Sequence, residues 1–176
     1  MWFMSTLFSK EYFSHYRNRN RYYLFLLLTL GAVEGVFLSA DFYTTFIFFE
    51  LMSFTSYVWV AQDERKESLR AAGTYLAVAV IGGLVMLMGI YLLYSVTGTF
   101  EFKALAGVSG NPAAYTSLPQ AAAKKRLWAA GICMFFGFGA KAGAFPLHIW
   151  LPKAHPVAPA PASALLSGIL TKGGMF

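Results

Sequence analysis

The chain has 176 residues, of which 57% are hydrophobic and 12% are charged. A soluble domain carries roughly twice that charged fraction, so the composition excludes an ordinary soluble protein and predicts a polytopic membrane protein. The net charge of +6 does not indicate nucleic-acid binding, because the basic residues lie mostly at the ends of apolar segments and no RNA-binding motif is present.

Residues 1–21 are predicted to form the end of a preceding helix and a basic loop, HYRNRNR, ahead of a transmembrane domain over residues 22–176. A helix that spans a membrane needs about 20 mostly apolar residues. Four segments reach this length, namely 22–40, 42–61, 71–96 and 127–147, the last with an irregular continuation to 151. A fifth begins near Pro161 and is cut off at Phe176. We therefore predict an all-α fold with four full transmembrane helices and a truncated fifth.

The connections between these segments predict how the helices are joined. Ser39-Ala40-Asp41 is a tight turn, which makes the first two helices an antiparallel hairpin with Asp41 as a helix cap. The second connection, QDERKESLR, is short, charged and expected to be solvated, and the third, over residues 97–126, is longer and polar.

The distribution of Lys and Arg predicts the orientation in a cytoplasmic membrane. With the N-terminus inside, eight basic residues fall on the inner side and four on the outer side, which favours a cytoplasmic N-terminus. The inner set is Lys10, Arg17, Arg19, Arg21, Arg65, Lys66, Arg70 and Lys153, and the outer set is Lys103, Lys124, Lys125 and Arg126.

Glu50 lies near the middle of the second predicted helix, in FIFFELMSFTSYVW. Ionisable side chains are costly inside a membrane and are functional by default. The alternative is a carboxyl group that is protonated, or hydrogen-bonded to Ser53 or Thr55.

Lys141 lies in GFGAKAGAFP, where small residues allow another backbone to approach closely. Pro146 should break the helix, and freed carbonyls at that depth require protein or water beside them, so water can reach Lys141. At a separation of about 4 Å, attraction between Lys141 and Glu50 amounts to about 4 kcal/mol at an effective dielectric near 20. That is enough to decide whether the lysine holds its proton near neutral pH, so the pair is predicted to form a proton switch.

Two histidines follow Lys141. His148 lies seven residues later, on nearly the same face if the helix is not distorted. It is either a proton relay or a side chain hydrogen-bonded to a carbonyl freed by Pro146. His155, in PKAHPVAPAP, is interpreted as an interfacial structural residue and kept as a further candidate.

Lys172 lies close to the middle of the last segment. Ser163, Ser167 and Thr171 recur before it at four-residue spacing on one face of the predicted helix, where they could hold a chain of water leading to Lys172. Glu34, in LGAVEGVF, lies deep in the first predicted helix, where it could pair with a basic residue or contact a missing partner. The sequence has no metal-ligand spacing, phosphate loop or catalytic triad, so no metal, cofactor or catalytic site is predicted.

Three stretches resemble one known family. They are LSADFYTTFIFFELMSFTSY, ESLRAAGTYL and KAGAFPLHIWLPKAHPVAPAPASALLSGILTKGG. The chain resembles the antiporter-like subunits of respiratory complex I, the large subunits of Mrp-type sodium/proton antiporters and the membrane subunits of energy-converting hydrogenases. Within this family, Lys172 makes the chain similar to the hydrogenase, Mrp and middle complex I branches.

The resemblance implies a fold of two inverted five-helix repeats, of which this chain matches the first, with a broken fourth helix. It implies that Glu50 is the family's glutamate, Lys141 its lysine partner, Lys172 the central-axis lysine and His148 the histidine of the PLHxWLP motif. The implied partners are other membrane-arm subunits, the lipid bilayer and protons, with sodium as the alternative ion. Glu34 has no counterpart in this pattern.

We therefore expect proton translocation within a larger complex, gated by the pairing of Lys141 with Glu50 and passing through His148 and water to Lys172. Because the chain stops inside an apolar segment, a fragment or a split-gene product is expected. The alternative function is that of a non-conducting structural subunit or a degenerate remnant.

Overall fold

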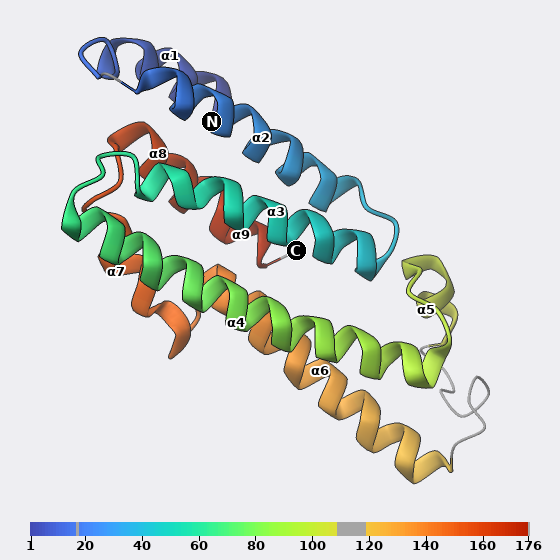
Figure 1. The fold of residues 1–176 in the computed structure, drawn as a ribbon. Helices are drawn as coiled ribbons and strands as arrows, with labels where there is room; N and C mark the ends of the chain where they lie inside the picture. The colour runs from blue at the N-terminus through green and yellow to red at the C-terminus, as the bar shows by residue number, and fades with distance from the viewer. Residues whose placement is uncertain (17, 109–118, 176) are drawn as a thin grey trace.

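A computed structural model describes residues 1–16, 18–108 and 119–175, and Figure 1 shows its helices. Arg17 and Phe176, which were used in the sequence predictions, lie outside this part of the chain, as do residues 109–118 of the third connection. The helices are α1 (Trp2–Tyr12), α2 (Arg19–Leu38), α3 (Phe42–Val60), α4 (Lys66–Thr97), α5 (Phe102–Val108), α6 (Gln120–Ala142), the 3₁₀ turn η2 (Leu147–Trp150), α7 (Leu151–Ala154), α8 (Ala160–Leu165), the π-helical turn η3 (Leu166–Leu170) and α9 (Thr171–Gly173). The fold predicted as all-α is helical throughout the described ranges, which contain no strand beyond an isolated bridge between Asp41 and Glu101.

Three segments are long and apolar enough to cross a membrane, namely Arg19–Leu38, Lys66–Thr97 and Gln120–Ala154. The prediction of four full spans is therefore supported for three, and α3 is the exception. Helix α3 carries Glu50 together with serines and threonines among its apolar residues. In Figure 1, α3 lies between α2 and α4, so protein covers much of its surface. A helix enclosed by other helices need not match the hydrocarbon in polarity.

The predicted α2–α3 hairpin is confirmed, and Asp41 is the N-cap of α3. Its carboxylate accepts hydrogen bonds from the backbone N–H and the hydroxyl of Thr44, both at 2.7 Å. The backbone N–H bond from Thr44 holds the pKa of Asp41 below its ordinary value, so the cap stays ionised at neutral pH. Backbone hydrogen bonds from Phe42 to Phe100 and from Phe102 to Ala40 join this turn to the start of α5, within the connection that the sequence predicts as loop.

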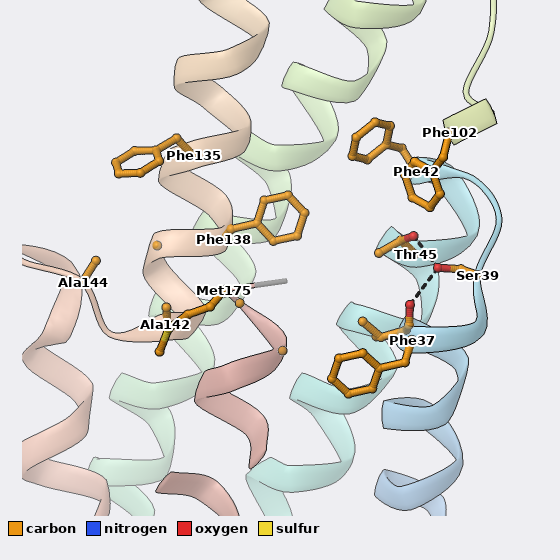
Figure 2. A pocket seen from close by; sticks show the side chains of 14 residues that line it. Phe37, Ser39, Phe42, Thr45, Phe102, Phe135, Phe138, Ala142, Ala144 and Met175 are labelled. Atoms are coloured by element: carbon orange, nitrogen blue, oxygen red, sulfur yellow. Dashed lines mark hydrogen bonds between the residues drawn. The ribbon is translucent and has the colours of Figure 1, made fainter. Parts of the chain in front are cut away.

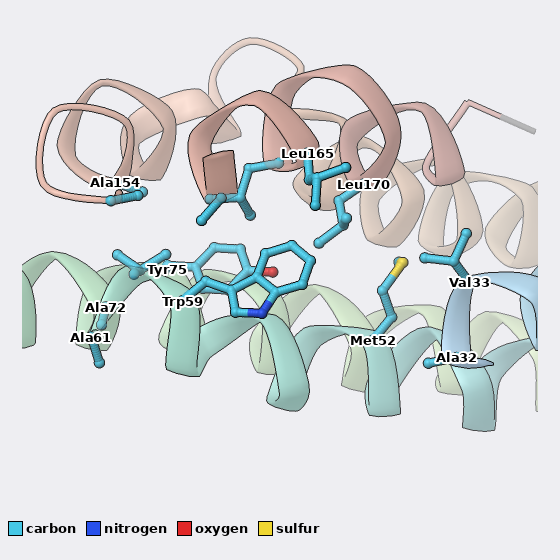
Figure 3. Packing of buried hydrophobic residues seen from close by; sticks show 14 of the residues in the cluster. Ala32, Val33, Met52, Trp59, Ala61, Ala72, Tyr75, Ala154, Leu165 and Leu170 are labelled. Carbon is cyan, nitrogen blue, oxygen red and sulfur yellow. The ribbon is translucent and has the colours of Figure 1, made fainter. Parts of the chain in front are cut away.

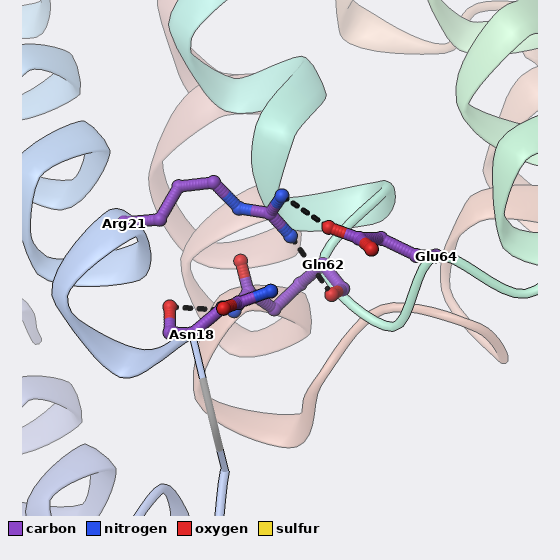
Figure 4. Close-up of polar contacts among 4 residues, drawn as sticks. All are labelled: Asn18, Arg21, Gln62 and Glu64. Atoms are coloured by element: carbon purple, nitrogen blue, oxygen red, sulfur yellow. Dashed lines mark hydrogen bonds and ion pairs between the residues drawn. The ribbon is translucent and has the colours of Figure 1, made fainter.

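The charged connection between α3 and α4 is solvated as predicted, with Glu64, Arg65 and Lys66 exposed, and it is also tied to α2. Arg21 forms an ion pair with Glu64 and donates to the Gln62 carbonyl at 3.1 Å (Figure 4). The Gln62 side chain, which is buried, donates to the carbonyl of Asn18 at 3.2 Å. This end of the bundle is thereby tied to the turn that precedes α2. The residues from Lys66 onward form the first turns of α4 and are not loop.

The C-terminal helices pack across α3 and α4 and complete the apolar core. In Figure 3, Leu165 and Leu170 point toward these helices, where Trp59, Tyr75 and Met52 lie. All five side chains are almost fully buried. The run α8–η3–α9 therefore covers the inner face of the bundle beside the end of α6.

Helices α4 and α6 approach each other closely through small residues. A Cβ atom added at Gly137 would lie 2.7 Å from the carbonyl oxygen of Gly82 and would overlap the side chain of Met86. Backbones that come this close exclude any side chain larger than hydrogen, as expected for small-residue helix contacts in membranes.

We predict that Gly137→Ala destabilises the protein by about 1–3 kcal/mol, the usual cost of overpacking a filled core. Gly131→Ala on the same helix is the matched control, because a Cβ atom there meets no atom within 4 Å. The measurement is the thermal unfolding midpoint of the purified, intact protein in detergent. Equal midpoints for the two variants would contradict the packing described for α4 and α6.

Candidate functional site

Lys141 lies in the last turn of α6, and only 2% of its surface is exposed. Its Nζ atom donates hydrogen bonds to Tyr75 Oη at 2.6 Å and to Ser53 Oγ at 2.9 Å. Tyr75 comes from α4 and Ser53 from α3, so three helices meet at the ammonium group. A buried charge needs such partners, because the desolvation of an unpaired ion costs several kcal/mol.

Two aromatic rings complete the surroundings of the ammonium group. Nζ lies 4.9 Å from the centre of the Tyr75 ring and 5.9 Å from that of Phe49. Both separations fall within the range in which a ring face attracts a cation. The Tyr75 hydroxyl also lies 2.7 Å from Ser56 Oγ, which extends the network by one residue.

The predicted helix break is present, and it begins before Pro146. Helix α6 ends at Ala142, and Gly143 has φ +73°, a left-handed conformation that suits glycine. The chain then turns back through η2. Trp150 donates from Nε1 to the carbonyl oxygen of Ala140 at 2.9 Å. The break thus brings an indole ring to the turn that carries Lys141.

Trp150 also positions Tyr75. The centres of their rings are 4.9 Å apart, and both side chains are 1% exposed. The same indole therefore satisfies a backbone carbonyl beside Lys141 and packs against the tyrosine that accepts its hydrogen bond. Tyr75, Ser56 and Trp150 are not among the residues predicted from the sequence. Their signal is weak, because a tyrosine or tryptophan in an apolar segment is usually core packing.

Glu50 is half-buried and does not form the expected ion pair. Within the described residues an ion pair joins Arg21 to Glu64, and none joins Glu50 to Lys141. The two groups are nevertheless close enough to interact electrostatically. No hydrogen-bond partner in the described part of the chain reaches the buried Glu50 Oε1.

The alternative partners weighed for Glu50 are engaged elsewhere. Ser53 accepts from Lys141, and Thr55 accepts from Thr29 at 2.9 Å. The carboxyl group lies against Gly83 of α4, where an added Cβ atom would overlap Oε1. Gly83 therefore supplies the space that the carboxyl group occupies.

His148 does not share a face with Lys141. Its side chain is exposed, and its ring stacks on Phe145 with 5.7 Å between centres. The expectation of a common face required an undistorted helix from Lys141 onward. Because the helix ends at Ala142, that geometry is lost.

Lys172 is exposed on α9, and the predicted polar face leading to it is interrupted. The π-helical turn Leu166–Leu170 shifts the helix phase, so that Ser167 is exposed while Thr171 is buried. Ser163 instead lies 2.7 Å from Nδ1 of His155. The spacing of four therefore does not produce one continuous face.

His155 lies in the turn between α7 and α8, beyond the last candidate span. Burial lowers its pKa, so the ring is neutral at neutral pH and suited to its contact with Ser163. Glu34 is exposed on α2, four residues before the helix ends at Leu38. It is therefore nearer the helix end than the sequence suggested, and the contacts around Lys141 do not include it.

A cavity of about 970 Å³ lies beside the end of α6, lined in part by Ala142 and Gly173, the chain neighbours of Lys141 and Lys172 (Figure 2). Phenylalanines 42, 102, 135 and 138 give it an apolar lining, and Ser39 is hydrogen-bonded to Thr45 at 2.5 Å beside it. None of the ionisable candidates belongs to its described lining. Across the described residues, no group of three or more His, Cys, Asp or Glu side chains is placed to hold a metal ion.

Comparison with known proteins gives a family. The transmembrane region shared by NADH:quinone oxidoreductase and Mrp antiporter proteins matches residues 39–176. A Na(+)/H(+) antiporter component of Bacillus subtilis is 32% identical over 160 residues, covering 91% of this chain and 31% of the relative. Hydrogenase-4 component B of Escherichia coli is 30% identical over 173 residues, which cover 97% of this chain and 24% of that protein.

Two solved structures are similar to this fold. One is the membrane-bound sulfane sulfur reductase, an archaeal respiratory membrane complex, with a TM-score of 0.82 and 25% identity over 92% of this chain and 31% of that one. The other is the Mrp complex from Dietzia sp. DQ12-45-1b, with a TM-score of 0.72 and 26% identity. The match covers 86% of this chain and 27% of that one. The chain thus spans about a quarter to a third of the length of the proteins that it matches.

We predict that Trp150→Phe loosens the end of α6, because it leaves the Ala140 carbonyl without its hydrogen-bond donor. An unsatisfied buried carbonyl costs about 1–3 kcal/mol of folding free energy. Hydrogen exchange of the amides from residue 137 to 151, followed by mass spectrometry on the intact protein, should become faster. Trp128→Phe on the same helix is the control, since that ring is 67% exposed. Unchanged exchange in Trp150→Phe would show that the indole does not hold the break.

Proposed function

Because the chain belongs to the family of NADH:quinone oxidoreductase and Mrp antiporter membrane proteins, we propose that it translocates protons within a larger membrane complex, with Lys141 as the group that binds and releases the proton. The observation that carries this proposal is the burial of Lys141 among hydroxyls and rings, beside a carboxyl group that it does not pair with. A purely structural lysine would be expected to reach water or an anion.

The unpaired state of Glu50 supports a role as the switching partner. A half-buried carboxyl oxygen without a hydrogen-bond donor is costly, and such groups persist mainly where function requires them. The lysine stem is flexible, and Glu50 is close enough to interact with it electrostatically, so Nζ is proposed to exchange its hydroxyl partners for the Glu50 carboxylate. We propose that Lys141 holds its proton in one of these two arrangements, with the hydroxyls or with Glu50, and releases it on passage to the other.

The onward route is part of the same proposal. His148 and Lys172 are exposed on the described chain, so transfer to either requires water or adjoining protein. Membrane proteins of the same complex, in a cytoplasmic membrane, are the proposed neighbours. The N-terminus is proposed to face the cytoplasm, as the basic residues favour.

The chemistry around Lys141 favours a proton over a sodium ion. Sodium requires several oxygen ligands, whereas an ammonium group repels a cation and exchanges protons. Sodium/proton exchange is the second candidate, because the Bacillus subtilis relative is named as part of a Na(+)/H(+) antiporter. A sodium gradient that drives or opposes proton movement in vesicles would favour this candidate.

We predict that Lys141→Ala and Glu50→Gln each reduce proton transport by about 100-fold or more, the scale of losing an essential proton-transfer group. Transport is measured with a fluorescent pH-gradient dye in vesicles containing the intact complex. Lys125→Ala and Glu67→Gln are matched controls with exposed side chains and should transport normally.

Amounts of assembled complex are compared in all four variants. Full transport in both Lys141→Ala and Glu50→Gln, with normal assembly, would contradict the proposal. That result would favour a non-conducting structural role or a degenerate remnant instead.

A further inference from the structure

The donor and acceptor roles of the hydroxyl groups around Lys141 are fixed, because each hydroxyl has a single hydrogen to donate. The Ser56 hydroxyl lies 2.5 Å from the carbonyl oxygen of Met52, which can only accept, so its hydrogen is committed there. Ser56 Oγ must then accept in its 2.7 Å contact with Tyr75. Tyr75 therefore donates to Ser56 and presents a lone pair to Lys141.

Ser53 follows the same pattern. Its hydroxyl donates to the carbonyl oxygen of Phe49 at 2.9 Å and so accepts from Lys141. Both hydroxyl partners of Nζ therefore point their hydrogens away from it. Hydrogen bonds from a charged donor are stronger than those from a neutral amine, so two lone pairs directed at Nζ favour the charged ammonium.

We propose that Tyr75 is a positioning residue that holds the charged form of Lys141 away from Glu50 and thereby sets the pH range over which this lysine exchanges its proton. This inference rests on the proposed function, because it assigns Tyr75 a role at the same lysine. The structure gives Tyr75 two contributions to this role. Its hydroxyl accepts the shorter of the two hydrogen bonds from Nζ, and its ring face lies 4.9 Å from Nζ.

The groups that face Lys141 come from several elements. Glu50 on α3 and Tyr75 on α4 are the titratable ones around it in the described chain. Trp150 from η2 adds an uncharged ring against Tyr75. The charged or titratable side chains that η2 and α9 could add, His148 and Lys172, are exposed.

Tyr75 itself has little freedom to move. Its ring is 1% exposed and packs against Trp150, while its hydroxyl is anchored on Ser56. Lys141, on a long flexible stem, is the mobile partner. Tyr75 and Glu50 therefore compete for the same ammonium group, one as a fixed hydroxyl and the other as a carboxylate.

The test is Tyr75→Phe in the intact complex, which removes the hydroxyl and keeps the ring. Proton transport should persist, with its half-maximal pH moved toward alkali by about one unit, because the lysine released from Tyr75 pairs with the Glu50 carboxylate, which stabilises the charged form more than a neutral hydroxyl does. Tyr91→Phe is the matched control, since this tyrosine lies on the same helix with an exposed side chain. Its pH profile should overlay that of the unmodified protein.

An unchanged profile for Tyr75→Phe, or a shift toward acid, would overturn the role of Tyr75. If Lys141→Ala abolishes transport in the same experiment, only this inference fails, whereas full transport in Lys141→Ala overturns the proposed function as well. Should Tyr75→Phe fail to assemble, Ser56→Ala replaces it, because it removes the acceptor that fixes the Tyr75 hydroxyl. A smaller alkaline shift in Ser56→Ala supports the inference, and no shift overturns it.

Discussion

The buried charge of Lys141 is the constraint on which the rest of this structure depends. An ammonium group taken out of water must recover several kcal/mol from its new partners. Here the recovery comes from two hydroxyls and two ring faces supplied by α3 and α4. The polar residues of α3 include Ser53, which accepts a hydrogen bond from this lysine.

The close packing of α4 and α6 serves the same site. Gly137 brings the two backbones together one turn before Lys141. The Nζ atom of Lys141 on α6 can therefore reach the hydroxyl of Tyr75 on α4. Gly83, on α4, leaves room for the carboxyl group of Glu50. Small residues on facing helices therefore position both the cation and the anion, although neither glycine contributes a polar side chain.

The sequence was sufficient to predict the long helices, the hairpin with its Asp41 cap and a break in the fourth helix. These follow from local rules, namely apolar length, capping chemistry and the effect of glycine and proline on a helix. The sequence did not predict the enclosure of Lys141, which was expected to be reached by water and is 2% exposed. Partners separated by tens of residues could not be predicted in this way. Tyr75 lies 66 residues from Lys141, and their contact depends on how α4 and α6 pack. The exposure of His148 and Lys172 was missed because it depends on a helix end and a π-helical turn, whose positions simple spacing does not indicate.

The break after Ala142 does more than expose backbone carbonyls. The chain after the break places Trp150 against the last turn of α6, which carries Lys141. One indole then contacts both a carbonyl of α6 and the ring of Tyr75. A displacement of the segment after the break would therefore act on the lysine and on its acceptor together. Closely packed interiors transmit such shifts, since neighbouring side chains have little free volume in which to absorb them. The broken helix thus couples the segment after Ala142 to both Lys141 and Tyr75.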